Sequence, residues 1–156
     1  MKFRILFFLC TILIIVALFF VSVFTQTNKS PIKQLSGVTY VEIGSTTIPV
    51  EIADTEQSRI MGLSGRKTLP IDTGMFFVFD VIGRNEIWMK DMNFPIDIMW
   101  ISDDFKIVES LQNVSPETFP QAFGRDVLSL YVLEVPSGFI VSHGINVLDT
   151  VKLITN

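Results

Sequence analysis

A long apolar segment near the N-terminus constrains this chain more than any other feature of its sequence. Ile5 to Phe24 are twenty consecutive positions at which only Thr11 and Ser22 are polar. A helix of this length rises about 1.5 Å per residue and spans roughly 30 Å, the thickness of the hydrocarbon core of a membrane. We therefore expect residues 5–24 to form a transmembrane signal-anchor helix.

The flanks of this segment favour a retained anchor over a cleaved signal peptide. A signal peptide has an apolar region of about 7–15 residues that ends in a small-x-small cleavage site. Here the run is longer, and residues 22–26 read Ser-Val-Phe-Thr-Gln. Lys2 and Arg4 favour a cytoplasmic N-terminus of residues 1–4, although Lys29 and Lys33 weaken that bias. The expected location is the cell membrane, crossed once, with the C-terminal part extracytoplasmic; a cleaved, secreted form is the alternative.

The remainder divides into a polar linker, residues 25–37, and one domain, residues 38–156, because this length supports a single hydrophobic core. The domain contains no cysteine, which excludes disulfides, thiolate nucleophiles and cysteine metal sites there. Beyond Arg4, ten basic residues face sixteen acidic ones, a net charge of 10 − 16 = −6. This balance argues against nucleic acid and anionic lipid surfaces as partners.

The domain is expected to be predominantly β. Short segments that alternate in period two, or that are rich in β-branched and aromatic residues, predict strands. These strands are 38–43, 48–52, 75–79, 87–89, 96–101, 106–111, 128–135 and 151–154. Pro49 suggests that its strand is at a sheet edge. Asp54 to Gln57 have the pattern of a capping box and predict one helix that continues to about Leu63, and a single helical turn is expected between Pro136 and Gly144. The fold class is therefore α+β, either a small barrel-like domain or a mixed sheet of seven to nine short strands with one short helix.

A series of short motifs runs in order through the domain. They are Arg59-x-x-Gly62-Leu63, Leu69-Pro70 before Gly74-Met75-x-Phe77-x-Phe79, Trp88-Met89-Lys90 before Pro95-Ile96-Asp97, Leu133-Glu134-x-Pro136-x-Gly138, and His143-Gly144-Ile145. This set resembles domain-of-unknown-function family 192 (DUF192) over about residues 38–154. The resemblance implies a compact β-rich fold, often exported or membrane-tethered in bacteria and archaea, and it implies no particular activity.

Two positions depart from the pattern of that family. Leu148-Asp149 stands where Gly-Asp is frequent, so the turn before the last strand is expected to differ. The loop from Val114 to Pro120 lacks the cysteines that many members carry after the fifth or sixth strand. A disulfide or thiol role in that loop is therefore not expected.

The candidate pocket is expected around the loop that Trp88 and Asp97 enclose. Lys90 lies beside Trp88 and Met89, where partial desolvation lowers the pKa of a lysine, and Asp97 or Glu134 can tune it. The structural alternative is a partly buried Lys90–Asp97 pair that fixes the loop.

Arg59, on the predicted helix, is suited to grip a carboxylate or phosphate. The alternative is that it anchors the helix to a carboxylate of the sheet, such as Asp80 or Asp97. Trp88 and Trp100 similarly suit either a ligand groove or core packing.

Other chemistry has less support. His143 is the single histidine, so a His-rich zinc site is excluded, and we expect it to interact with free carbonyls at a helix end. Met89 and Met92 have a spacing that Cu(I) sites use, but methionine is also a routine core residue. No metal or cofactor is expected.

The sequence leads to one main hypothesis and two alternatives. The main one is a membrane-tethered, extracytoplasmic, non-catalytic module of the cell envelope that binds a small ligand, a glycan or a protein, with Arg59, Trp88, Lys90, Asp97 and Glu134 forming its pocket. The first alternative is a hydrolase or lyase that acts on envelope material with Lys90, Asp97, Glu134 or His143 as acid or base. The second is copper handling through methionines.

Overall fold

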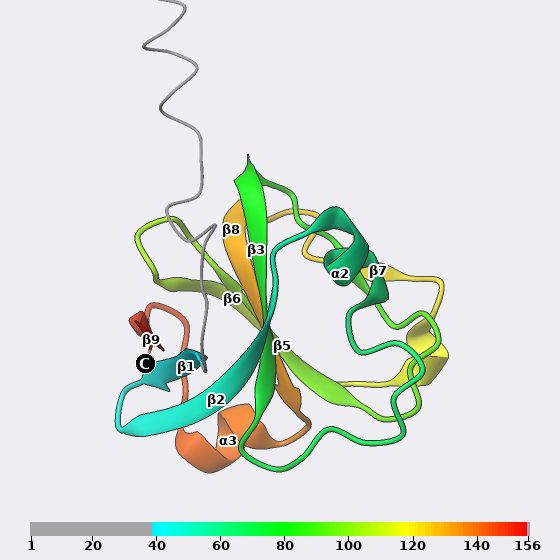
Figure 1. Cartoon of the computed structure of the whole chain (residues 1–156), viewed down its shortest axis with the longest axis horizontal. Coiled ribbons are helices and arrows are strands. Elements are labelled where there is room, and N and C mark those ends of the chain that lie inside the picture. The colour runs from blue at the N-terminus through cyan, green and yellow to red at the C-terminus, as the bar shows by residue number, and fades with distance from the viewer. Residues whose placement is uncertain (1–38, 156) are drawn as a thin grey trace, which may run out of the picture.

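The computed structural model describes residues 39–155 as a predominantly β domain (Figure 1). Its strands are β1 (Thr39–Ile43), β2 (Thr46–Ala53), β3 (Gly74–Gly83), β4 (Ile87–Trp88), β5 (Ile96–Ile101), β6 (Ile107–Val114), β7 (Ala122–Phe123), β8 (Ser129–Pro136) and β9 (Val151–Thr155). Its helices are α2 (Glu56–Met61), α3 (Phe139–His143) and the 3-10 helix η1 (Pro116–Thr118). The expected membrane helix, residues 5–24, and the linker, residues 25–37, lie outside the described residues. Between residues 39 and 155, no helix is long and apolar enough to cross a membrane.

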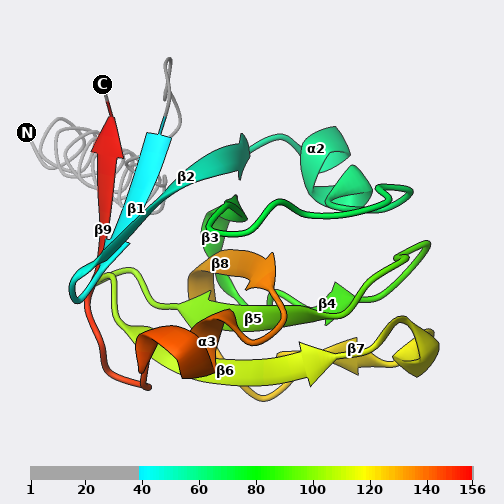
Figure 2. The ribbon, with the colours of Figure 1, turned by 90° about the horizontal axis from the view of Figure 1, so that it is seen from below.

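Seven strands form one mixed sheet, in the order β6-β5-β8-β3-β2-β1-β9, and β4 pairs with β7 in a small second sheet. All neighbours are antiparallel except β2 and β3, which run parallel. The direction of the strands turns strongly across the sheet, as Figure 2 shows. Its two edges meet at one corner, through a bridge between Lys106 and Thr150. The described residues therefore form an open mixed sheet, and no barrel closes.

The helix α2 begins one residue later than the sequence pattern indicated. Its N-cap is Thr55, whose Oγ1 accepts a hydrogen bond from the Ser58 backbone N–H at 3.1 Å, while Ser58 Oγ accepts from Thr55 N–H at 3.0 Å. This is a capping box in which serine takes the place usually held by Glu or Gln. The expected Asp54–Gln57 box is wrong because Ser58 forms both reciprocal bonds with Thr55.

The edge position expected from Pro49 is also wrong, because β2 lies between β1 and β3. Pro49 pairs with Tyr40 of β1, whereas the parallel pairing to β3 begins one residue later, at Val50 and Gly74. The missing N–H of Pro49 therefore lies where β2 has no partner on its β3 side. An interior strand tolerates proline at such a place.

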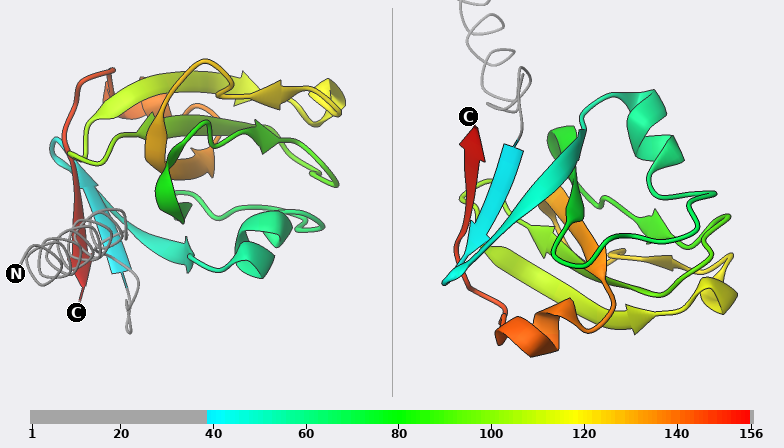
Figure 3. Two further views of the ribbon diagram at one scale, coloured as in Figure 1. Left: turned by 90° about the horizontal axis from the view of Figure 1, so that it is seen from above. Right: turned by 60° about the horizontal axis from the view of Figure 1, so that its bottom comes forward.

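Two hydrophobic clusters lie on opposite faces of the sheet. Alternate residues of β5 supply them: Met99 and Ile101 belong to the cluster that also holds Phe139 and Ile140 of α3, whereas Trp100 belongs to the other. Figure 3 shows α2 and α3 on different sides of the domain, with the central strands between them. Every residue of β5 is buried, because both of its faces are covered.

Asp97 attaches α3 to the sheet. Its carboxyl is fully buried and accepts two backbone hydrogen bonds, from Ile140 N–H at 2.9 Å and from Asn113 N–H at 2.8 Å. Ile140 lies in the first turn of α3, and Asn113 has a positive φ near the end of β6. One carboxyl group therefore satisfies two buried donors and holds two elements in place.

A tight contact fixes the buried indole of Trp100. The indole Nε1–H donates to the Asn85 carbonyl at 2.9 Å, and Gly124 packs against its ring, with a φ of 83°. A Cβ at Gly124 would overlap the indole. Gly138 has a similar φ of 88° but open space around it. The two glycines thus share a positive φ, but only Gly124 has another side chain in the space that a Cβ would occupy.

We expect Asp97→Asn to destabilise the domain, because an amide NH2 replaces one acceptor and leaves one buried N–H unsatisfied. The expected loss of unfolding free energy is about 2–3 kcal/mol. Urea denaturation of the full chain in detergent, followed by tryptophan fluorescence, measures it. Asp103→Asn in the exposed turn is the matched control and should unfold like wild type. Equal stability of the two variants would contradict the role given to Asp97.

Gly124→Ala should destabilise far more than Gly138→Ala. Both variants place a Cβ at positive φ, which costs about 1–2 kcal/mol. Only Gly124→Ala also overlaps Trp100, and overpacking of a core adds about 1–3 kcal/mol. Thermal unfolding monitored by near-UV circular dichroism compares the two. A similar melting temperature for both would show that the indole moves aside without loss.

Candidate functional site

The helix α2 and the short strand β4 border a small cavity on the face of the sheet opposite α3. Its volume is about 50 Å³. A shallower groove of about 260 Å³ adjoins it along shared residues of α2, β3 and β4. The cavity is lined by Arg59, Ile60, Met61, Gly62, Leu63, Ser64, Phe77, Glu86, Ile87, Trp88, Met92, Ile96 and Glu134.

Glu134 is the buried polar residue of this cavity. It lies on β8, between Met75 of β3 and Ile98 of β5, and its residue surface is 5% exposed. No residue between 39 and 155 forms a hydrogen bond with its carboxyl group. Burial raises the pKa of Glu134 to about 8, and the positive charge of Arg66 opposes this effect. The carboxyl is therefore mostly protonated at neutral pH, and it has both a donor and an acceptor available.

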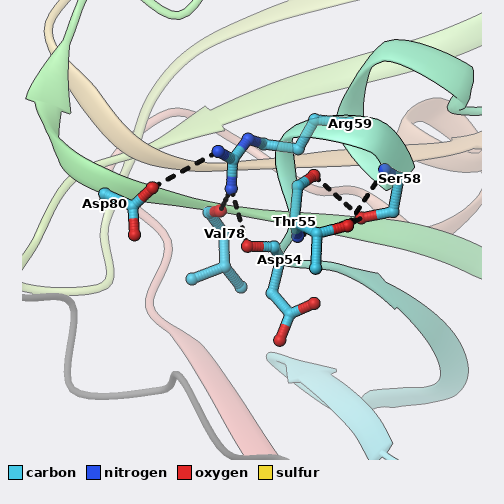
Figure 4. Close-up of polar contacts among 6 residues, drawn as sticks. All are labelled: Asp54, Thr55, Ser58, Arg59, Val78 and Asp80. Carbon is cyan, nitrogen blue, oxygen red and sulfur yellow. Dashed lines mark hydrogen bonds and ion pairs between the residues drawn. The ribbon is translucent and has the colours of Figure 1, made fainter.

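Arg59 holds α2 against β3, as Figure 4 shows. Its Nη1 donates to the carbonyls of Asp54 at 2.8 Å and Val78 at 2.7 Å, and its Nη2 pairs with Asp80 at 3.3 Å. The guanidinium also lies over the ring of Phe79, 5.4 Å from its centroid. The interpretation of Arg59 as an anchor through Asp80 is confirmed, and the same side chain forms part of the cavity wall.

Trp88 forms the outer rim of the cavity. The residue is 49% exposed, and its ring lies edge-on to Phe119 with 6.3 Å between centroids. Lys90 Nζ lies 5.8 Å from the centroid of the Trp88 ring, and Ser64 Oγ donates to the Lys90 carbonyl at 2.8 Å. Lys90 is exposed and does not line the cavity.

The expected pair of Lys90 and Asp97 is not formed. Asp97 points to the α3 face with Met99 and Ile101, because alternate residues of β5 share a face. Of the five predicted pocket residues, Arg59, Trp88 and Glu134 line one cavity. Lys90 lies beside Trp88 at the rim of the cavity without lining it, and Asp97 lies on the other side of the sheet.

Glu86 is a lining residue that sequence reasoning missed. It precedes β4 in a loop, lines both the cavity and the groove, and lies 3.6 Å from Arg125 in an exposed ion pair. Nothing in the local pattern distinguishes it from other exposed acidic residues. Leu63 and Phe77, by contrast, belong to motifs that the sequence had singled out, although neither was predicted to line a pocket.

The acid and base candidates of the enzyme hypothesis do not come together. His143 ends α3, where its Nδ1 bonds to the Phe139 carbonyl at 2.9 Å and its Nε2 lies 3.9 Å from Asp72. This carbonyl belongs to the first residue of α3, so the expected interaction of His143 with free carbonyls at the C-terminal end of a helix is not the one that forms. His143 and Asp97 therefore lie on the α3 side, away from Glu134.

Met89 and Met92, the pair with the spacing of Cu(I) sites, lie on the same side of the sheet. Met75, Met89 and Met92 belong to the cluster on the cavity side, and Met99 belongs to the cluster on the α3 side. In the described part of the chain, no group of three His, Cys, Asp or Glu residues is placed to hold a metal ion. The cavity therefore offers one buried carboxyl, that of Glu134, beside the polar residues Arg59, Ser64 and Glu86 and an apolar part of the lining.

Two solved structures are similar to this one. A Sinorhizobium meliloti protein described as a candidate transcription regulator superposes with a TM-score of 0.69 and 26% identity, over 76% of this chain and 96% of that one. A protein of unknown function from Novosphingobium aromaticivorans gives a TM-score of 0.62 and 26% identity, over 74% of this chain and 83% of that one.

The family comparison covers nearly the whole described domain. No curated protein matches the sequence. The model of DUF192, a family described as "Uncharacterized ACR", matches residues 39–153, which include every motif from Arg59 to Ile145 that carries the resemblance. The chain therefore belongs to the DUF192 family.

Proposed function

We propose that this protein is a non-catalytic binding module of the cell envelope, tethered to the membrane, which takes a small ligand into the cavity between α2 and β4. The observation that carries the proposal is Glu134: a buried carboxyl without a hydrogen-bond partner in the described domain, in a cavity that apolar side chains and the polar residues Arg59, Ser64 and Glu86 line together. A concave site in which apolar side chains and several polar groups converge is a candidate for ligand binding.

The energetics of Glu134 support a functional role. A polar group sealed from water without a partner destabilises a fold by about 1–3 kcal/mol. The oxygens of Glu134 are not among the sealed polar atoms of the described residues, so its penalty is smaller than this. Glu134 lies in the central part of the sheet, where an apolar residue of similar size would pack without that loss. Asp97, the other buried carboxyl of the central strands, accepts two backbone hydrogen bonds. Perturbed carboxyl groups in clefts are frequent at functional sites.

The distribution of the other candidates favours binding over catalysis. A general acid needs a base, nucleophile or stabilising group within reach of the same reacting atom. Lys90, Asp97 and His143 do not line the cavity with Glu134. Arg59 has both protons of Nη1 bonded to carbonyls and Nη2 paired with Asp80. The hydrolase or lyase alternative would thus depend on Glu134 and Glu86.

The proposed location is based on the apolar segment Ile5–Phe24 and on the acidic balance of the chain beyond that segment. A linker of residues 25–37 reaches at most roughly 45 Å when fully extended. The domain would therefore remain close to the membrane surface. The same excess of sixteen acidic over ten basic residues gives no support for extending a transcription-regulator role to this chain.

The burial of Glu134 predicts a pH dependence of stability. Its pKa is 4.5 in an ordinary setting and about 8 in the folded chain, so between these values the folded chain binds the proton and the unfolded chain releases it. The unfolding free energy of wild type relative to Glu134→Gln should be greatest below pH 4.5 and fall as pH rises to about 8, by up to about 5 kcal/mol. Urea denaturation between pH 4.5 and 9 measures the difference.

The exposed Glu117 supplies the control for this experiment. Glu117→Gln removes the same charge from the surface and should follow wild type across the pH series. If the wild-type and Glu134→Gln curves stay parallel from pH 4.5 to 9, Glu134 is not buried as described. The structural basis of the proposal would then be lost.

The binding function itself is testable with a panel of small envelope compounds. Amino sugars, neutral sugars, amino acid amides, short peptides and alkylamines are added to the full chain in a detergent without a sugar head group. A compound present at ten times its dissociation constant should stabilise the fold by about 1.4 kcal/mol, which raises the melting temperature by several degrees. Mass spectrometry of the same mixtures follows whether the compound is consumed.

Two variants tie any such effect to the cavity. Glu134→Leu and Trp88→Ala should abolish the stabilisation, whereas Val141→Ala, at an exposed site on α3, should preserve it. Absence of any compound-dependent shift would reject the binding proposal. Conversion of a compound to product, lost in Glu134→Gln, would favour the enzyme alternative instead.

A further inference from the structure

The size of the cavity limits the group that it can enclose. One buried water needs roughly 10–15 Å³ of this kind of volume. A cavity of about 50 Å³ therefore has room for about four water-sized positions. It suits a group of about four heavy atoms, with the rest of the ligand in the adjoining groove of about 260 Å³.

The lining of the cavity defines the polarity of that group. Leu63, Phe77, Ile87 and Ile96 supply apolar surface, and Glu134 supplies a carboxyl group with no hydrogen-bond partner in the described domain. A protonated carboxyl donates through its O–H and accepts through its C=O. An amide has the matching pair, a carbonyl that accepts and an N–H that donates. A group with one methyl and one amide therefore complements both parts of the lining.

A cationic group fits less well than a neutral amide. It would require Glu134 to ionise, and at neutral pH this carboxyl holds its proton. The guanidinium of Arg66, whose positive charge acts on Glu134 although Glu51 pairs with it, would oppose an added positive charge in the cavity. Glu86, the other carboxylate of the lining, already lies against Arg125. The charges around Glu134 thus favour a neutral ligand group.

The rim suits a ring with apolar and polar faces. Trp88 is half exposed, and Ile60 and Met61 of α2 are 64% and 58% exposed beside the same cavity. The C–H face of a pyranose ring packs against an indole, while its hydroxyl groups remain in water. The groove opens directly from the cavity and shares Trp88 with it. A sugar ring attached to the enclosed group would lie against this rim.

We propose that the cavity binds the acetamido group of an N-acetylated amino sugar, with the Glu134 carboxyl bonded to the amide and the sugar ring against Trp88. The ligand class is thus a glycan that carries N-acetylamino sugars. This inference rests on the binding function proposed above and specifies its ligand.

The test uses N-acetylglucosamine as the probe, titrated into the full chain in a detergent without a sugar head group and followed by calorimetry at pH 6.5. Glucose and glucosamine lack the acetamido group and should bind about tenfold more weakly or not at all, since one hydrogen bond and a buried methyl are lost. Nε-acetyllysine amide carries the same acetamido group on an alkyl chain and should bind more weakly than the sugar.

Variants at Glu134 separate its hydrogen bonds from its charge. Glu134→Gln keeps a donor and an acceptor and should bind within about threefold of wild type, whereas Glu134→Leu should lose about tenfold or more. Wild-type affinity should fall as pH rises past about 8, because the ionised carboxyl no longer donates, and Glu134→Gln should show no such fall. The charged groups near this carboxyl are Arg59 of α2, Arg66 with its partner Glu51, and Glu86 before β4.

Each contrary outcome has a distinct meaning. If glucosamine binds more tightly above pH 8, the cavity is a site for a cation and not for an amide. If Nε-acetyllysine amide binds more tightly than N-acetylglucosamine, the ligand is an acetylated peptide and not a glycan. Either result overturns this inference and leaves the binding function in place, provided that it depends on Glu134. If no compound of the larger panel binds, both proposals fail together.

Discussion

The burial of β5 and β8 on both faces is the constraint on which the rest of this domain depends. These strands lie side by side in the sheet, all of β5 is buried, and only Pro136 of β8 is partly exposed. Any polar side chain on them must find a partner within the protein or lose the hydrogen bonds that water gave it. Asp97 on β5 and Glu134 on β8 are the two carboxyl groups placed there.

The two carboxyl groups meet this constraint in opposite ways. Asp97 faces α3 and accepts hydrogen bonds from two backbone N–H groups. Glu134 faces the cavity side and has no hydrogen bond within the described domain, so burial keeps it protonated to about pH 8. The first carboxyl thus builds the fold. The second has no protein partner, so its hydrogen bonds are open to water or to a ligand in the cavity, and for this reason the binding proposal centres on it.

Much of the fold can be predicted from local sequence, but the arrangement of the sheet cannot. The period-two segments located β5 at 96–101 and most of the other strands within a few residues. The short strand β7 was not predicted, because a strand of two residues shows no periodicity in the sequence. The position of Pro49 next to, and not within, the parallel pairing of β2 and β3 depends on register. Register is a property of contacts between distant segments, which one sequence does not display.

The site was predicted only in part for the same physical reason. Alternation along each strand shows that Asp97 and Ile98 face opposite sides, and likewise Glu134 and Val135. Whether Asp97 shares a side with Glu134 depends on how β5 pairs with β8. The pairing of Ile98 with Glu134 and of Asp97 with Val135 separates the two carboxyl groups, and a shift of one residue would bring them to the same face. The register therefore places Glu134 with Arg59 and Trp88 in one cavity, and it directs Asp97 to the opposite face, where its carboxyl bonds to α3.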